Sequence, residues 1–211
     1  MKIGGGMLDN KGFDLWADGY DKSVGLSDDS NTYPFAGYKE ILNEIYNRIL
    51  KSSAKNVLDI GFGTGTLTSR LYEDGLKIFG QDFSYEMKKI AKEKMPEANL
   101  YCGDFSKGLV DPLMGEKYDA IIATYSLHHL NDIEKIDLIY SILHLLNDGG
   151  KIYIGDVAFA TRYDLLACKE KMRQYWDDDE FYFVYDELKD HIKHLSFDKY
   201  SFCSGILTIS K

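Results

Sequence analysis

Residues 57–65 read VLDIGFGTG, and this stretch decides how the rest of the chain can fold. Its first four residues form a short β-type run, and glycines then occupy every second position, at Gly61, Gly63 and Gly65. Because glycine lacks a Cβ atom, its backbone can turn tightly and come close to a bound molecule. A strand followed by such a loop and then by a helix predicts the first βα unit of a ligand-binding α/β sheet.

The segments around this stretch repeat the alternation of strand and helix. Short apolar runs predict strands at residues 56–60, 76–81, 99–102, 118–124 and 151–156. Helices are predicted between and after them at residues 64–72, 85–95, 133–146 and 162–175. Ser84 and Asp132 are the expected N-caps of the second and third of these helices. This alternation predicts a doubly wound, mostly parallel sheet.

The two ends of the chain depart from the alternation. An apolar stripe over residues 36–50 predicts an amphipathic helix, and residues 1–53 are interpreted as an N-terminal helical cap. Residues 54–211 would form the cofactor-binding core of the same single domain. Residues 195–202 and 206–210 predict an antiparallel hairpin at one sheet edge. The expected fold class is therefore α/β, a Rossmann-like doubly wound sheet with a C-terminal antiparallel hairpin strand and an N-terminal helical cap.

The composition narrows the range of partners and compartments. Acidic residues number 34 against 25 basic ones, and the net charge of −9 makes a nucleic-acid partner unexpected because phosphates would be repelled. No signal segment and no run of ~18 apolar residues is found, so a cytoplasmic protein without membrane association is expected. Cys102, Cys168 and Cys203 lie far apart and are expected to be small buried residues.

Two carboxylates near the glycine loop indicate the kind of cofactor. Asp59 precedes the first glycine by two residues, where it would repel a pyrophosphate but attract the ammonium and sulfonium of S-adenosylmethionine. The alternative is that the Asp59 carboxylate has only a structural role and stabilises the loop. Asp82 follows Gly61 by 21 residues, the spacing at which an acidic residue accepts from both ribose hydroxyls of an adenosine. The pair predicts a cofactor that contains adenosine and carries positive charge.

Two further segments follow the third and fourth predicted strands, where the carboxyl ends of a parallel sheet meet. After the third strand, Asp104 is expected to accept from the adenine amino group, with Phe83 or Phe105 against the ring face. After the fourth, His128 and His129 are candidates for a general base, because imidazole titrates near neutrality. Adjacent histidines are more often structural, and that alternative stays open.

Taken in this order, the segments resemble the motifs of the class I S-adenosylmethionine-dependent methyltransferases over essentially the whole chain. The resemblance is carried by VLDIGFGTG at 57–65, GQDFS at 80–84, GDF at 103–105 and LNDGGK at 146–151. FDLWADGYD at 13–21 is similar to the opening of small bacterial methyltransferases with an N-terminal helical cap. The resemblance implies S-adenosyl-L-methionine as the cofactor and methyl transfer as the reaction.

The resemblance also implies roles for single residues. Tyr20 would lie over the methionine end of the cofactor, which Thr124 and Tyr125 would approach from the fourth strand. Phe13, Trp16 and Tyr20 share one helical face, which we interpret as part of a mobile lid. The expected cofactor-binding residues are Tyr20, Asp59, Gly61, Gly63, Asp82, Phe83, Asp104, Phe105, Thr124 and Tyr125.

The methyl acceptor is expected to be a small molecule. TYS at 124–126 stands where amino-methylating DNA enzymes carry Asn or Asp before two prolines, and no proline precedes a cysteine. Val157 follows Asp156 where metal-dependent catechol-type enzymes carry Asp-Asn, so no metal site is expected. Transfer from a sulfonium is an in-line displacement, in which the protein mainly aligns donor and acceptor.

Two other functions compete with this interpretation. A small NAD-dependent dehydrogenase would share the glycine loop and the acidic residue after the second strand. It would also need Tyr-x-x-x-Lys on a helix after the fifth strand, and neither Tyr85 with Lys89 nor Tyr185 with Lys189 meets that requirement. A non-catalytic module that binds S-adenosylmethionine or a nucleotide could lose the loop or the carboxylate, and both are intact.

Overall fold

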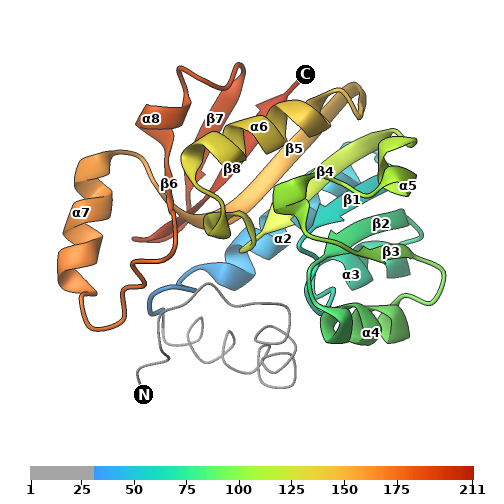
Figure 1. The fold of residues 1–211 in the computed structure, drawn as a ribbon, viewed down its shortest axis with the longest axis horizontal. Coiled ribbons are helices and arrows are strands. Elements are labelled where there is room, and N and C mark those ends of the chain that lie inside the picture. Colours follow the sequence, from blue (N-terminus) through green and yellow to red (C-terminus); the bar gives the residue numbers. More distant parts are fainter. Residues whose placement is uncertain (1–30) are drawn as a thin grey trace.

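A computed structural model describes residues 31–211 (Figure 1), and the expectations for Phe13, Trp16 and Tyr20, the lid included, lie outside these residues. The described residues form an eight-stranded sheet in the order β3-β2-β1-β4-β5-β8-β7, with β6 paired to the end of β5. The strands are β1 (Asn56–Ile60), β2 (Lys77–Asp82), β3 (Asn99–Cys102), β4 (Tyr118–Thr124), β5 (Leu146–Phe159), β6 (Phe183–Val184), β7 (Leu195–Lys199) and β8 (Ser204–Ser210).

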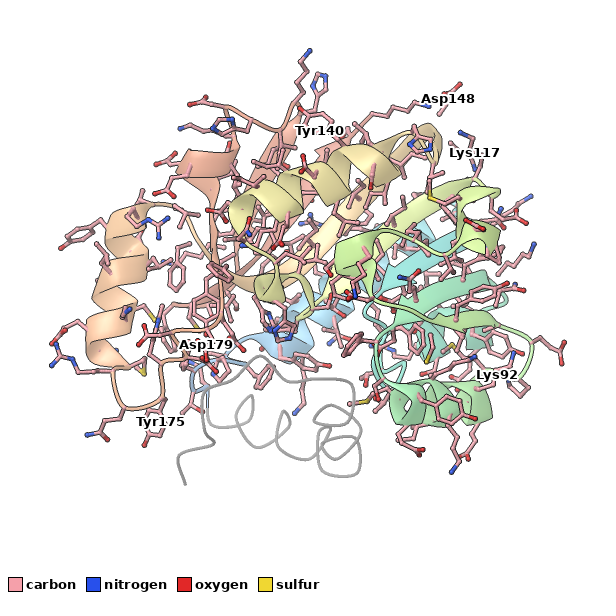
Figure 2. All side chains as sticks on the ribbon, viewed as in Figure 1. Lys92, Lys117, Tyr140, Asp148, Tyr175 and Asp179 are labelled. Atoms are coloured by element: carbon pink, nitrogen blue, oxygen red, sulfur yellow. The ribbon has the colours of Figure 1, made fainter. Side chains whose placement is uncertain are left out.

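The central strands are parallel, and those at the C-terminal end are antiparallel. β1 pairs in parallel with β2 and β4, and Asp59 lies opposite Gly80 on one side and Ile122 on the other. β8 pairs antiparallel with β5, and β7 antiparallel with β8 at the edge. Lys117 and Asp148, labelled in Figure 2, mark the edge from which β4 and β5 start, and the carboxyl ends lie at the opposite edge. The predicted Rossmann-like α/β sheet is confirmed.

Helices connect the strands and cover both faces of the sheet. The described α-helices are α2 (Tyr38–Lys51), α3 (Thr68–Glu73), α4 (Tyr85–Lys94), α5 (Asp111–Met114), α6 (Asp132–Leu143), α7 (Arg162–Lys171) and α8 (Tyr185–Leu188), with short 3-10 helices η1 (Phe105–Lys107) and η2 (Leu127–His129). Ile45, Leu71 and Ala91 from α2, α3 and α4 belong to one core cluster. Leu113 and Ile139 from α5 and α6 belong to the other. The central strands are therefore buried on both sides.

The starts of α3 and α4 show which helix boundaries depend only on neighbouring residues. The helix expected from Thr64 begins at Thr68, because Gly65 has a φ of 75° and the residues after it continue as a turn. α4 begins as predicted, with the Ser84 hydroxyl accepting from the backbone N–H of Met87 at 3.1 Å. An N-cap can be predicted because it depends on a residue next to the helix. The length of the loop before a helix depends on how that loop packs against the rest of the protein.

Three expectations farther along the chain were wrong. The N-cap of α6 is Asn131 and not Asp132, because Glu134 completes a capping box with Asn131. α6 ends at Leu143, and β5 begins already at Leu146, so the predicted turn into the fifth strand belongs to the strand. α7 ends at Lys171, short of the predicted end.

The cysteines correct a fourth expectation. Cys168 and Cys203 are buried, as expected for small apolar residues, but Cys102 is exposed at the end of the edge strand β3. The region between η1 and α6 also holds α5, which the sequence did not predict.

The described part of the predicted helical cap packs against the sheet. α2 buries Ile41 and Ile45 against the middle of β5, where Gly155 faces the helix. A Cβ atom added at Gly155 would lie 2.4 Å from Cγ2 of Ile41 and 3.0 Å from Cδ1 of Ile45. The missing side chain at this position allows the helix to approach the strand closely.

Gly155→Ala is therefore expected to lower the free energy of unfolding by about 1–3 kcal/mol, the usual cost of overpacking a well-packed core. Gly115→Ala is the matched control, because a Cβ at Gly115 meets nothing within 4 Å among the described residues and its φ is −84°. Urea unfolding followed by tryptophan fluorescence measures both variants. Equal stability of the two variants would contradict the close approach of α2 to β5.

Candidate active site

The loop after β1 combines three glycines with left-handed backbone, at Gly61, Gly63 and Gly65. A Cβ at Gly61 would lie 2.3 Å from Cβ of Ser126, and one at Gly65 would lie 2.8 Å from Cε of Met95. A Cβ at Gly63 would meet nothing within 4 Å in the described part of the chain. Gly61 and Gly65 thus make room for protein atoms, and at Gly63 no described residue fills the place of a Cβ, so that a ligand can approach the backbone there.

Asp59 is fully buried beneath this loop and carries an unsatisfied oxygen. Its Oδ1 has no hydrogen-bond partner within the described residues, and the nearby hydroxyl of Thr68 also lacks one. Burial raises the pKa of Asp59 to about 8, which outweighs the lowering effect of the nearby Thr68 hydroxyl, and the charge of Asp82 adds a smaller increase. A buried oxygen acceptor of this kind is costly to the fold unless a donor reaches it. The ammonium of S-adenosylmethionine is such a donor, so the residues present fit this cofactor.

Asp82 joins the glycine loop to the end of β2. Its Oδ2 accepts from the backbone N–H of Gly63 at 2.8 Å, and its Oδ1 accepts from that of Ser84 at 2.8 Å. A carboxylate oxygen has two lone pairs, so each can accept from more than one donor. The side chain of Phe83 beside it is half-buried.

The segment after β3 forms a second wall of the candidate site, next to the glycine loop. Asp104 caps η1, accepting from the backbone N–H of Ser106 at 3.0 Å, and forms an ion pair with Lys107 at 3.0 Å. Burial opposes ionisation, but these donors outweigh it and lower the pKa of Asp104. Cε1 of Phe105 lies 3.6 Å from the place of a Cβ on Gly61, which brings its ring to the glycine loop.

Gln81 is a residue of this wall that the sequence interpretation missed. Its side-chain amide donates to the carbonyl of Gly108 at 3.1 Å and accepts from the N–H of Val110 at 2.8 Å. Gln81 is fully buried and thereby fixes the loop that carries Asp104 and Phe105. A polar side chain inside the apolar run of β2 was the available signal.

Tyr125 follows the end of β4. This residue has a φ of 51°, and its ring packs against Phe35 at 5.3 Å and Tyr38 at 5.1 Å between ring centroids. The buried ring of Tyr125 thus lies beside the start of α2. Thr124 stays half-buried at the edge, with Cγ2 3.8 Å from the place of a Cβ on Gly155.

His128 belongs to a buried ionic group beyond β4. Its Nδ1 lies 2.7 Å from Oδ1 of Asp156, and its Nε2 lies 3.6 Å from Oε1 of Glu180. Burial alone would lower the pKa of His128, but the Asp156 carboxylate outweighs it and raises the pKa to about 9. Burial, together with the charge on His128, lowers the pKa of the neighbouring His129 to about 3.

Asp156 and Glu180 were not among the predicted site residues. Asp156 lies fully buried in β5, and its Oδ2 has no partner within residues 31–211. A carboxylate inside the apolar run of the fifth strand was the signal for it. Glu180 belongs to an aromatic and acidic stretch around residues 175–183, in which Tyr175, labelled in Figure 2, is exposed and Tyr182 is buried.

Most predicted site residues that the structure describes converge at one edge of the sheet. Ser126 holds this edge together, because its hydroxyl donates to the carbonyl of Ile60 at 2.8 Å and its Cβ fills the space above Gly61. Tyr20 lies outside the described residues. Within the described residues, no helix is long and apolar enough to cross a membrane.

One family model and two relatives that match this chain carry the same kind of description, that of a methyltransferase. A family model described as a methyltransferase domain matches residues 57–150. A relative from Anoxybacillus flavithermus, described as an uncharacterized methyltransferase, is 38% identical over 167 residues, or 78% of this chain and 76% of the relative. A relative from Bacillus cytotoxicus with the same description is 41% identical over 164 residues, or 76% of this chain and 74% of the relative.

Solved structures are similar in fold. An S-adenosylmethionine-dependent methyltransferase from Clostridium acetobutylicum has a TM-score of 0.64 at 16% identity, covering 91% of this chain and 99% of that chain. Magnesium protoporphyrin IX methyltransferase from Synechocystis with bound S-adenosylhomocysteine (SAH) has a TM-score of 0.63 at 18% identity, covering 82% and 83%. With the curated relatives, these findings show that the chain belongs to the class I S-adenosylmethionine-dependent methyltransferases.

Proposed function

We propose that this enzyme transfers the methyl group of S-adenosylmethionine to a small molecule by in-line displacement. The observation that supports this most is the buried, unsatisfied oxygen of Asp59 beside the open backbone of Gly63. A cationic cofactor provides the donor that this oxygen lacks.

A small acceptor agrees with the charge of the chain and with one structural relative. The net charge of −9 disfavours nucleic acid as a substrate. The Synechocystis relative is named for a small molecule, magnesium protoporphyrin IX. The wide spacing of Cys102, Cys168 and Cys203, with no C-x-x-C pair, agrees with a reducing, cytoplasmic location.

In this proposal, the segments at the ends of β1, β2 and β3 each bind one part of the cofactor. Asp59 accepts from the ammonium, Asp82 accepts from the ribose hydroxyls, and Gly63 lies against the cofactor through its backbone. Phe83 and Phe105 cover the adenine. When bound, the cofactor supplies a methyl group activated by the sulfonium, and the chain's own groups align the acceptor and exclude water.

Four further residues belong to the proposed cofactor site. Asp104 borders the adenine through a carboxylate already fixed by Ser106. Tyr20, which lies outside the described residues, is expected to approach the methionine end together with Thr124 and Tyr125, whose ring packs against Tyr38.

The acceptor approaches from the side of His128 and His129, the candidates for a general base. A general base works best with a pKa near the working pH. The pKa of His128 is about 9 and that of His129 is about 3, so neither ring is well matched to proton abstraction at pH 7. The histidine pair therefore has a better rationale in positioning the acceptor than in removing its proton.

Calorimetry tests the proposed function. The full-length protein is expected to bind SAH at one site per chain, and NADH is not expected to compete. A panel of small hydroxyl, amine, thiol and carboxylate compounds, followed by the release of SAH, then identifies the acceptor class. Binding of NADH without binding of SAH would overturn the proposal.

Asp82→Ala is expected to weaken SAH binding by about 2–3 kcal/mol, because hydrogen bonds to a charged group are lost. This corresponds to a Kd roughly 30- to 150-fold higher. Lys89→Ala, at an exposed position of α4, serves as a nearby control with an unchanged Kd. An unchanged Kd for Asp82→Ala would mean that the ribose binds elsewhere.

Asp59→Asn is expected to weaken SAH binding and yet stabilise the ligand-free protein as the pH rises. The folded-state pKa of about 8 lies above the unfolded value, so the native state binds more protons and loses stability between about pH 4 and pH 8. The variant has no such loss. Its free energy of unfolding relative to the wild type should therefore rise across that window, by about 1.4 kcal/mol per pH unit at most and about 5 kcal/mol in all, measured by urea unfolding.

Asp119→Asn is the control of opposite sign. Asp119 accepts from the backbone N–H groups of Lys55 and Asn56 at 2.8 and 2.9 Å. These donors outweigh burial and lower its pKa. The Asp119→Asn variant should be less stable than the wild type at pH 7, and the difference should shrink as the pH falls below about 4. If the Asp59→Asn and wild-type curves run parallel from pH 4 to pH 8, the ionisation of Asp59 is not coupled to folding.

A further inference from the structure

Two histidines and a glutamate point at one another beyond the carboxyl end of β4. His128 and His129 are consecutive in η2, and Glu180 comes from the segment before β6. One ligand atom from each of the three lies within 4.8 Å of the other two. The 3.6 Å between Nε2 of His128 and Oε1 of Glu180 is close to the ~3.4 Å that separates two ligand atoms around a tetrahedral zinc ion.

The backbone holds Glu180 at this place. The N–H of Phe181 donates to the carbonyl of His128 at 2.7 Å, which fixes the segment before β6 against η2. The buried Lys135 ammonium donates to the carbonyl of Phe181 and, at 3.1 Å, to Asp132. The three side chains are therefore brought together by contacts that do not involve their own ligand atoms.

Asp156 and Tyr182 contact the atoms of His128 and Glu180 that face away from the cluster. Asp156 contacts Nδ1 of His128 at 2.7 Å, which leaves Nε2 directed at the cluster. The hydroxyl of Tyr182 donates to Oε2 of Glu180 at 2.6 Å, which leaves Oε1 directed at His128. Carboxylates behind histidine ligands and hydrogen bonds behind carboxylate ligands are the usual outer shell of metal sites.

The charges of the cluster also suit a dication. Asp156 and Glu180 bring two carboxylates to His128, and the nearby Lys135 ammonium is already paired with Asp132. His129 lies directly beside His128, with 4.3 Å between the centroids of the two rings.

We propose that His128, His129 and Glu180 form a binding site for a divalent transition metal ion such as Zn²⁺ or Fe²⁺. Two imidazole nitrogens and one carboxylate form a ligand set that these ions prefer, and three protein ligands leave coordination positions open. Asp156 and Tyr182 position the ligands. The sequence predicted no metal because it considered Asp156 as a ligand in an Asp-Asn pair, whereas Asp156 contacts the ligand His128 instead.

The site lies beside the proposed cofactor site. Ser126, two residues before His128, fills the space above Gly61 in the glycine loop. An ion at this place would hold the methyl acceptor by an oxygen, nitrogen or sulfur atom next to the cofactor. This role rests on the proposed function, whereas metal binding itself does not.

Cobalt titration of the full-length, tag-free, metal-stripped protein tests the site. Co²⁺ is expected to bind at one site per chain with the ligand-field absorption of a four- or five-coordinate ion, and Zn²⁺ is expected to displace it. Glu180→Gln, His129→Asn and Asp156→Asn should each raise the Kd for Co²⁺ by roughly 10- to 100-fold. His191→Asn, an exposed histidine, is the matched control with an unchanged Kd.

Absent Co²⁺ binding, or equal affinity of the wild type and Glu180→Gln, would overturn the metal site. Near-ultraviolet circular dichroism checks that Asp156→Asn folds. Glu180→Gln decides the question if it does not, because the Glu180 side chain is partly exposed, at 23%. Asp82→Ala separates the two proposals, since it should lose SAH affinity and keep Co²⁺ affinity. A protein that binds SAH but no Co²⁺ would fail the metal proposal alone, and the reverse result would fail the cofactor site alone.

Discussion

The parallel pairing of β1 with β2 and β4 is the constraint on which the rest of the molecule depends. Each parallel neighbour requires a crossover through a helix, so the chain returns to the same edge of the sheet after every strand. The glycine loop, Asp82 and the segment around His128 meet for that reason. A shift of β1 by one residue would turn Asp59 to the opposite face, because side chains alternate along a strand.

The candidate site at this edge buries polar side chains at positions where apolar side chains would stabilise the fold more. Asp59 and Asp156 are fully buried, and each has an oxygen without a partner within the described residues. The apolar clusters on both faces of the sheet supply the stability that tolerates this cost. Strain and unsatisfied groups concentrate where ligands bind, because a ligand and not the fold completes the interactions there.

Features that depend on neighbouring residues could be predicted, and features that depend on distant ones could not. The bounds of β3 and β4 and the Ser84 cap follow from apolar runs and from a hydroxyl beside a helix start. The start of α6 was misplaced by one residue because Asn131 and Asp132 can both cap, and only the position of Glu134 decides between them. The contact between His128 and Glu180 joins segments far apart in the chain, and no local pattern encodes it.

The sequence by itself determined the fold class, the family and the cofactor, because glycine spacing, strand-end carboxylates and apolar periodicity act over a few residues. Only the tertiary structure decided that, among the described residues, side-chain atoms fill the place of a Cβ at Gly61 but not at Gly63, and that the ring of Tyr125 turns toward α2. It also decided that Asp156 and Glu180 bracket His128. The physical reason is that the direction of a side chain and the pKa of a buried group depend on what packs around them, and those neighbours come from all parts of the chain.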